Sequence, residues 1–300
     1  MANRRVLVKR RKSVRSIRKI TRTMQLIATA RFQAAYNRAV ATKPYAEKLA
    51  ELVADIARAA TIEHPLLATH EEVKRSALVV LTSQRGLAGG YNSSVLRAAI
   101  GHLEAQEKLG VETAVQMMGK KGVAFFRFLH RPMAEQRTDL ADTPRFEEIE
   151  PIANDLMARF TRGEIASAHV AYMRFLSAGQ QKPAVVQLLP LAQAAEGAAG
   201  GTGEPPEGAR AAGKQIEYEF SPGPQELLDE LLPAVVRMRL FQAFTDAAVS
   251  EQIARMVAMK AATDAAGDMI KALTRKYNRA RQTQITMELL DIVGGANALS

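Results

Sequence analysis

Apolar side chains recur at helical spacing along both ends of the chain. Near the N-terminus no Gly or Pro occurs between residues 2 and 43, so a helix can run for about 60 Å without interruption. Pro44 then starts, kinks or ends a turn. The apolar positions that recur among the polar ones are Val14, Ile17, Ile20, Met24, Ile27 and Phe32. This pattern predicts an amphipathic helix.

The C-terminal part carries a longer pattern of the same kind. Between Pro233 and Gly294 only Gly267 disfavours a helix, which allows a helix of roughly 60 residues, or about 90 Å. The apolar or small positions alternate steps of three and four: Met256, Met259, Thr263, Ala266, Ile270, Leu273, Tyr277 and Ala280. A mean spacing of about 3.5 residues is typical of a left-handed coiled coil. We predict that this seam packs against the N-terminal helix.

Between these helices, short apolar runs alternate with helical stretches. The expected strands cover 77–83, 113–118, 167–176 and 184–189, and the expected helices lie near 91–109, 119–129 and 144–162. This alternation predicts β-α-β units and a largely parallel, open sheet. The expected fold class is therefore α/β, a central Rossmann-like open sheet, plus a long antiparallel α-helical coiled coil of the N- and C-terminal helices.

This organisation divides the chain into four segments. They are 1–60 for the N-terminal coiled-coil helix, 75–191 for the Rossmann-like domain, 192–224 for a mobile linker with a short strand, and 225–300 for the C-terminal coiled-coil helix. Residues 192–213 are rich in Ala, Gly and Pro, a composition typical of a flexible loop. We assign them no function.

The net charge of +10 points to an acidic partner, and the cations gather near the N-terminus. Residues 1–46 contain thirteen Lys and Arg and no acidic residue.

No apolar run approaches the roughly 20 residues that span a bilayer, so we expect no membrane insertion. The absence of Cys excludes disulfides and thiolate sites, and the five scattered His make a metal site improbable.

A glycine-rich turn follows the first expected strand, in the sequence LVVLTSQRGLAGGYN of residues 78–92. A phosphate-binding P-loop would need G-x-x-x-x-G-K-[ST], and a dinucleotide site would need G-x-G-x-x-G. Gly86, Gly89 and Gly90 fit neither spacing, and no Lys follows them. A tight turn between a strand and a helix is therefore favoured over a nucleotide site.

Carboxylates cluster at Glu147, Glu148 and Glu150, and again at Asp229 and Glu230. Both groups follow prolines near expected helix N-termini, where the helix dipole favours acids without any catalytic role. No nucleophile with a base and no metal cluster stands out. We therefore expect that the chain is not catalytic by itself, and we expect no cofactor.

Three stretches resemble one known family. They are SIRKITRTMQLIATARF near the N-terminus, TSQRGLAGGYN after the first expected strand, and SEQIARMVAMKAATDAAGDMIKALTRKYNRARQTQITMELLDIVGGANAL near the C-terminus. Their order and spacing are similar to those of the gamma subunit of the F-type rotary ATP synthase, over essentially the whole chain. Gln84 stands where this family usually has Asp, Ala88 where many members have Cys, and Ala265 where Asn is common.

The resemblance implies a central-stalk shaft, not itself catalytic, that couples proton flow to ATP synthesis or hydrolysis at the beta subunits. The implied partners are a ring of alpha and beta subunits, the epsilon subunit and the membrane c-ring, at the cytoplasmic face of the bacterial inner membrane. Beta subunits of this family present an acidic segment to the shaft. The implied contact and coupling residues are Met24, Arg85, Ala88, Arg255, Gln282, Thr286 and Glu288, and the apolar tail 289–299 corresponds to the shaft tip.

Two other classes of function stay open from the residues alone. A basic coiled coil could bind nucleic acid or an anionic membrane through residues 4–22, although apolar side chains interrupt its charge and aromatic stacking residues are lacking there. A nucleotide-binding Rossmann enzyme is the second. Salt dependence of binding would identify the first class, and equilibrium dialysis with nucleotides the second.

Overall fold

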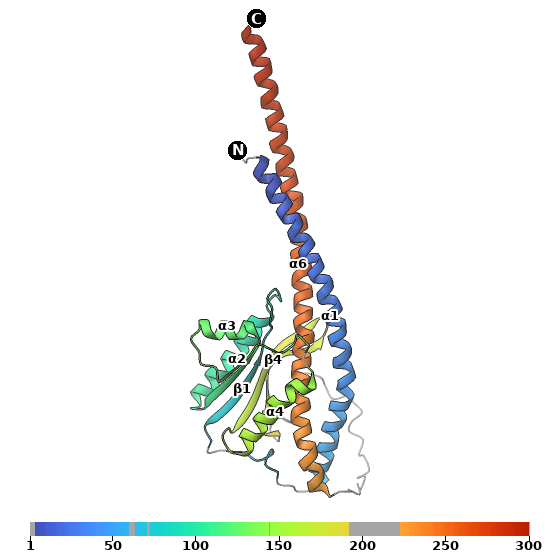
Figure 1. The fold of residues 1–300 in the computed structure, drawn as a ribbon, viewed down its shortest axis with the longest axis vertical. Coiled ribbons are helices and arrows are strands. Elements are labelled where there is room, and N and C mark those ends of the chain that lie inside the picture. The colour runs from blue at the N-terminus through green and yellow to red at the C-terminus, as the bar shows by residue number, and fades with distance from the viewer. Residues whose placement is uncertain (1–3, 60–63, 71–72, 144, 192–222, 300) are drawn as a thin grey trace, which may run out of the picture. The chain divides into compact units, whose positions relative to one another are not determined.

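The computed structural model describes residues 4–59, 64–70, 73–143, 145–191 and 223–299 (Figure 1). The elements in chain order are α1 (Arg4–Ala59), β1 (Arg75–Leu81), α2 (Tyr91–Lys108), β2 (Glu112–Met118), α3 (Lys120–Phe128), β3 (Glu135–Arg137), α4 (Phe146–Thr161), β4 (Ser167–Ser177), β5 (Gln180–Leu189) and α6 (Pro224–Leu299). The predicted linker and short strand lie almost entirely outside the described residues.

The chain forms two compact units, 1–31 with 254–300, and 32–253. Both long helices contribute to each unit, so this division runs through the helices rather than between them and the sheet. It differs from the division into 1–60, 75–191 and 225–300, which stays a prediction. We describe each unit by itself.

In the unit of 1–31 and 254–300, α1 and α6 pack along a seam. Leu7, Val14, Thr21 and Ala28 of α1 recur every seven residues and are buried or half-buried. At the centre, the Thr263 hydroxyl donates to Thr21 Oγ1 at 2.8 Å. The small side chains of Thr21 and Ala28 allow the two helices to approach closely.

The apolar positions predicted for the N-terminal helix fall into two groups, because Val14 is part of this seam and Met24 and Phe32 are half-buried, whereas three isoleucines are exposed. Ile17, Ile20 and Ile27 expose 52%, 59% and 49% of their surface. Ile20 and Ile27 directly precede the buried Thr21 and Ala28, so the seam uses smaller residues one position further along the helix. Part of the apolar pattern of α1 is therefore exposed within the described residues.

The unit of 32–253 contains a five-stranded sheet in the order β3-β2-β1-β4-β5. β1 pairs in parallel with β2 and β4, and β2 pairs in parallel with β3. β5 returns antiparallel beside β4. The α/β fold class with a largely parallel sheet is confirmed. Sequence reasoning missed the short β3, because its residues Glu135–Arg137 are all polar.

Helices cover both faces of the sheet. Val79 and Leu81 of β1 belong to a core shared with α4 and α6, which contribute side chains such as Phe160 and Leu240. Leu78 and Val80 point to the opposite face, and both are fully buried. The helices α2 and α3 cover that face (Figure 1). Burial on both faces explains why β1 reads as a continuous apolar run.

Both long helices continue past a proline. α1 runs through Pro44 and α6 through Pro233, although each proline removes one backbone hydrogen bond. Around Pro233 the buried Leu228, Leu232 and Val236 belong to the sheet core. Packing therefore outweighs the cost of the proline, and α6 begins at Pro224, before Pro233. No helix among the described residues combines the length and apolarity needed to cross a membrane.

Candidate functional site

The loop between β1 and α2 is held by side-chain hydrogen bonds around Ser83. The Ser83 N–H donates to Asn92 Oδ1 at 2.9 Å, and Asn92 Nδ2 donates to Ser83 Oγ at 2.8 Å. The Ser83 hydroxyl also lies 2.6 Å from the carbonyl oxygen of Arg85. Ser83 and Asn92, two polar residues of the sequence TSQRGLAGGYN, thus tie this loop to the first turn of α2.

The positive φ angles of this turn do not all fall on its glycines. Of Gly86, Gly89 and Gly90, only Gly89 has a positive φ, at 55°. Leu87 also adopts a positive φ, at 65°, and exposes 58% of its surface. A non-glycine residue with this backbone is strained and worth attention as a contact residue.

Protein acceptors occupy the first backbone N–H groups of α3 and two of those at the start of α2. At α3, the N–H groups of Gly119, Lys120, Lys121 and Gly122 donate to Arg137 O, Gln84 Oε1, Ser83 O and Thr82 Oγ1. At α2, Tyr91 N donates to Ala88 O and Ser94 N to Gly90 O. A phosphate cradle needs converging free N–H groups. The geometry thus supports a structural turn rather than a nucleotide site.

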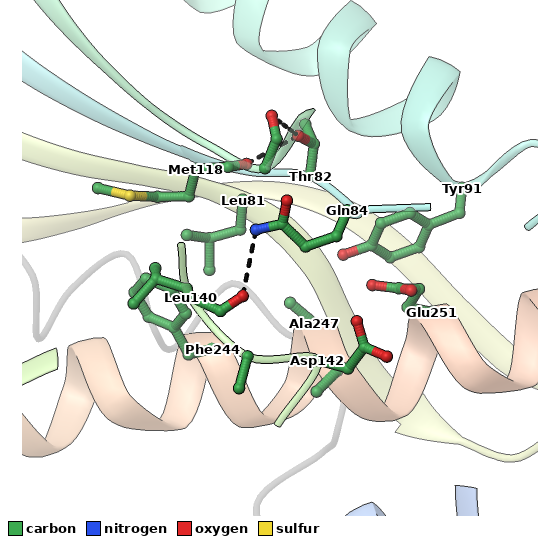
Figure 2. A pocket seen from close by; sticks show the side chains of 13 residues that line it. Leu81, Thr82, Gln84, Tyr91, Met118, Leu140, Asp142, Phe244, Ala247 and Glu251 are labelled. Carbon is green, nitrogen blue, oxygen red and sulfur yellow. Dashed lines mark hydrogen bonds between the residues drawn. The ribbon is translucent and has the colours of Figure 1, made fainter. Parts of the chain in front are cut away.

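Gln84 joins the loops that follow β1, β2 and β3. Its Nε2 donates to the carbonyl oxygen of Leu140 at 3.2 Å, and its Oε1 accepts from Lys120 N at 3.3 Å. Figure 2 shows the first of these bonds. The Asp that is usual in the resembling family could not donate to a carbonyl when ionised. The amide at this position therefore explains how the three loops of this chain are tied together.

A small cavity of about 50 Å³ lies beneath these loops, against α6 (Figure 2). Tyr91, Asp142 and Glu251 line it, and the Tyr91 hydroxyl points toward the Glu251 carboxylate. Ligand pockets occupy roughly 300–1,000 Å³, so the cavity has room for water but not for a nucleotide. Among the described residues, no three His, Asp or Glu side chains are grouped to hold a metal ion.

The predicted contact residues are divided between the two units. Arg85 and Ala88 belong to the unit of 32–253, and the other five belong to the unit of 1–31 and 254–300. The Arg85 side chain is 66% exposed and lies 3.8 Å from Asp142. Ala88 is only 2% exposed, so the neighbouring Leu87 occupies the surface that we expected Ala88 to share. The positive φ of Leu87 and Gly89 turns the chain inward between them.

The five residues on the long helices differ in accessibility. Met24 is half-buried, and Arg255 exposes only 8% of its surface. Gln282, Thr286 and Glu288 are exposed. Glu288 accepts a hydrogen bond from Gln284 Nε2 at 2.8 Å, and the Thr286 hydroxyl donates to the carbonyl oxygen of Gln282. The last three therefore lie on an open helix surface, and Arg255 does not.

The proposed seam positions of α6 face inward. Met259, Thr263 and Ala266 are buried, while the half-buried members are Met256, Ile270, Leu273, Tyr277 and Ala280. Arg11 of α1 lies over the Tyr277 ring, with 5.0 Å between the guanidinium carbon and the ring centroid.

Beyond the seam, α6 changes character. Every residue from Arg281 to Gly294 is exposed. The large apolar side chains among them, with 45–69% of their surface exposed, are Ile285, Met287, Leu289, Leu290, Ile292 and Val293. A bare apolar surface of this extent on a helix marks an interaction site. The sequence showed the apolar tail, but its isolation from the rest of the described chain is a structural finding.

Comparison with known proteins identifies the family. A sequence model described as ATP synthase matches residues 3–299. The chain is 42% identical to the ATP synthase gamma chain of Rhodopirellula baltica over 302 residues, covering 100% of this chain and 99% of that one. The chain belongs to the ATP synthase gamma family. A gamma chain of Frankia casuarinae is 41% identical, covering 97% and 96% of the two chains.

Solved structures agree on the fold of this gamma-family chain. A rotor chain of the Euglena gracilis mitochondrial ATP synthase aligns with a TM-score of 0.62 at 17% identity, covering 94% of this chain and 98% of that one. A central stalk/c-ring chain of Tetrahymena thermophila aligns at 0.54 and 19% identity, covering 81% and 99%. The relatives give no support to a nucleic-acid-binding or membrane-binding coiled coil.

Proposed function

We propose that this chain is the rotor shaft of an F-type proton-translocating ATP synthase. In this role its long helices stand inside a ring of alpha and beta subunits, and its α/β unit binds the epsilon subunit and the membrane c-ring. Family membership over residues 3–299 supports this assignment. The likeness to rotor and central-stalk chains supports the corresponding fold.

The exposed apolar end of α6 is the observation that carries the proposal. Residues 281–294 have no cover within the described chain, yet they include six large apolar side chains. A shaft tip that turns inside an apolar bearing would have this surface. Leu290 and Ile292, at 64% and 69% exposure, are the members that a surrounding ring would cover most.

The basic face of α1 gives the shaft an electrostatic partner. Thirteen Lys and Arg lie in residues 1–46, and no carboxylate neutralises them within that segment. An acidic segment on each beta subunit would attract this face and guide the register, while each exposed pair contributes little. Exposed charges of this kind change the rate of association and the orientation of the partners more than their affinity.

Coupling then follows from asymmetry. One shaft presents a different face to each of the surrounding beta subunits, and differential contacts bias each catalytic site between its conformations. In this account the chain transmits free energy and binds no nucleotide. We place the complex, with this chain as a peripheral subunit, at the cytoplasmic face of the bacterial inner membrane.

The test replaces apolar residues at the end of α6. Leu289→Asp with Leu290→Asp leaves the isolated chain folded, because both side chains are already exposed. In membrane vesicles containing the reconstituted complex, ATP hydrolysis should then drive much less proton pumping than with the native chain. A matched control is Leu109→Asp with Leu176→Asp, which makes the same two changes at exposed positions after α2 and in β4. Equal pumping by the Leu289/Leu290 variant and the native chain would contradict the shaft role of this end.

A further inference from the structure

Two histidine rings meet where α2 packs against the sheet (Figure 1). His102 is on α2 and His169 is on β4, and their ring centroids are 4.5 Å apart, with an angle of 51° between the ring planes. In the sheet His169 lies beside Leu78 of β1 and Gln187 of β5. Because register partners share a face and Leu78 is on the face that α2 covers, the side chain of His169 points toward α2 as well.

Each of the two rings has a buried nitrogen without a hydrogen-bond partner. These nitrogens are His102 Nε2 and His169 Nδ1. Nearly all buried polar atoms in folded proteins have a partner, and an atom that lacks one indicates a bound water or ion, or a functional role. Two such atoms on adjacent rings therefore point to one shared occupant.

The two nitrogens can both act as metal ligands. A neutral imidazole carries its proton on one nitrogen and a lone pair on the other. His102 Nδ1 and His169 Nε2 are not among the buried atoms without a partner, so they are the positions for the two protons. The buried nitrogens then present two lone pairs, which cannot satisfy each other but can bind one ion. Imidazole suits Cu²⁺, Ni²⁺ and Zn²⁺, whereas Mg²⁺ prefers oxygen ligands.

The separation of the rings indicates which coordination geometry fits. An imidazole nitrogen lies about 1.2 Å from its ring centroid and about 2.0 Å from a bound ion, so each centroid is about 3.2 Å from the ion. Two imidazoles at an angle of about 90° then have centroids about 4.5 Å apart, and at a tetrahedral angle about 5.2 Å apart. The observed 4.5 Å matches adjacent positions of a tetragonal site. Cu²⁺ and Ni²⁺ prefer this geometry, and Zn²⁺ does not.

We propose that His102 and His169 form a binding site for one divalent transition-metal ion in tetragonal coordination, the arrangement typical of Cu²⁺. The two imidazoles occupy adjacent positions, and water fills the others, because both side chains are half-buried rather than enclosed. The ion ties α2 to β4 and so stabilises this part of the chain. The site is separate from the loop after β1 and from the end of α6, and it does not depend on the proposed function.

A metal ion fits this position better than a single bridging water. A water could donate to both lone pairs, but a buried water typically makes about three hydrogen bonds. Leu78, which lies beside His169, offers no third partner. An ion with two imidazole ligands needs no further protein group, because solvent supplies the rest of its coordination.

The experiment measures Cu²⁺ binding to the full chain, prepared without an affinity tag and freed of metal with a chelator. Isothermal titration calorimetry should detect one Cu²⁺ ion per native chain, and Mg²⁺ should not bind. The electron paramagnetic resonance spectrum of the loaded chain should show a tetragonal Cu²⁺ with two imidazole nitrogens. The absence of Cys from the chain removes competition from thiolates.

His102→Gln and His169→Gln each remove one ligand. Either variant should bind Cu²⁺ about 100-fold more weakly, because a single imidazole loses the advantage of two linked ligands. The matched control is His130→Asn, which removes an exposed imidazole at a positive φ of 54° that asparagine tolerates. This control should bind within about twofold of the native chain. If His169→Gln does not fold, His102→Gln decides alone, since residue 102 is half-buried on a helix where glutamine is well tolerated.

The double variant separates a shared site from two independent ones. If both histidines hold one ion, removing the second ligand should weaken binding little beyond the first removal, so the two losses are not additive. Losses that multiply would mean two separate ions and would overturn the proposal. Equal Cu²⁺ affinity of the native chain and of both single variants would overturn it as well, because the ion would then bind elsewhere. A native chain that binds no Cu²⁺ would leave water as the occupant and the proposal wrong.

Discussion

A single amide side chain, that of Gln84, links three loops at the carboxyl ends of the parallel strands. Gln84→Glu keeps the length of the side chain and its acceptor for Lys120 N, but it removes the donor to Leu140 O. We expect a loss of about 1 kcal/mol in the free energy of unfolding, measured by urea denaturation. Gln84→Ala, which removes both bonds, should cost about twice as much.

The exposed Gln180 offers the matched control, since Gln180→Glu makes the same chemical change at the tip of a hairpin. Its free energy of unfolding should stay within about 0.5 kcal/mol of the native value. A Gln84→Glu variant as stable as the native chain would show that the loops are held together without this amide.

A pair of histidines lies between α2 and the sheet. The rings of His102 and His169 are 4.5 Å apart at their centroids, and neither His102 Nε2 nor His169 Nδ1 has a hydrogen-bond partner in the described structure. Burial, with a smaller contribution from His102, lowers the pKa of His169 from 6.5 to about 4. Its register partners, Leu78 on β1 and Gln187 on β5, carry no charge.

This pair predicts a loss of stability in acid. Between pH 6.5 and about 4 the unfolded chain binds a proton at residue 169 that the folded chain does not, so stability falls as the pH falls through this range. The full cost is at most about 3 kcal/mol. His169→Phe should flatten this part of the stability curve, measured by urea denaturation at several pH values. If the free energy of unfolding of this variant falls with pH as steeply as that of the native chain, His169 does not cause the loss of stability.

At the residue scale, the sequence predicted the turn at TSQRGLAGGYN but not its inner geometry. The positive φ angles of the turn fall on Leu87 and Gly89, and not on Gly86 or Gly90. The hydrogen bonds of Ser83 to Asn92 and Arg85 fix the path of the chain, and the loop after β2 packs against it. Such contacts depend on segments distant in sequence, which a local pattern cannot show.

At the scale of elements, the seam between α1 and α6 makes a sharp prediction about neighbouring residues. Ala28 is 1% exposed, whereas Ile27 next to it is 49% exposed. Ala28→Asp buries a charge in the helix pair and should lower the free energy of unfolding by several kcal/mol. Ile27→Asp should change it by less than about 1 kcal/mol, although it replaces the larger apolar residue.

Thermal and urea denaturation of the two variants, side by side, measure this difference. Equal destabilisation by the two substitutions would mean that the register of α1 in the seam is different from the one described. A large effect of Ile27→Asp with none of Ala28→Asp would support the stripe of larger apolar residues as the packing face.

The same seam shows how far periodicity carries a prediction. On α6 the alternating steps of three and four residues identified positions that are buried or half-buried, such as Met259 and Leu273. On α1 the apolar pattern included Val14 of the seam, but it also included the exposed Ile20 and Ile27 and left out Thr21 and Ala28, which give little hydrophobic signal. Within α6 the helix runs through Pro233, where packing against the sheet outweighs propensity.

At the scale of the whole molecule, the fold class was predictable because each part has its own period: strands and helices alternate in the centre, and long helices flank them. The candidate contact surfaces were less predictable from the sequence. The family resemblance implied which residues belong to them. The structure added which of these residues are accessible, such as Glu288, and which are not, such as Ala88 and Arg255. Burial is a property of the fold rather than of the motif.

The central claim is that this chain turns inside a ring of alpha and beta subunits. Because the chain has no Cys, Ala178→Cys provides a unique attachment point at the exposed end of the β4–β5 hairpin. With the ring fixed to a surface and a bead on this cysteine, adding ATP should produce continuous rotation in one direction, with stops that repeat three times per turn. Steady ATP hydrolysis by such complexes while the bead stays still would contradict the account.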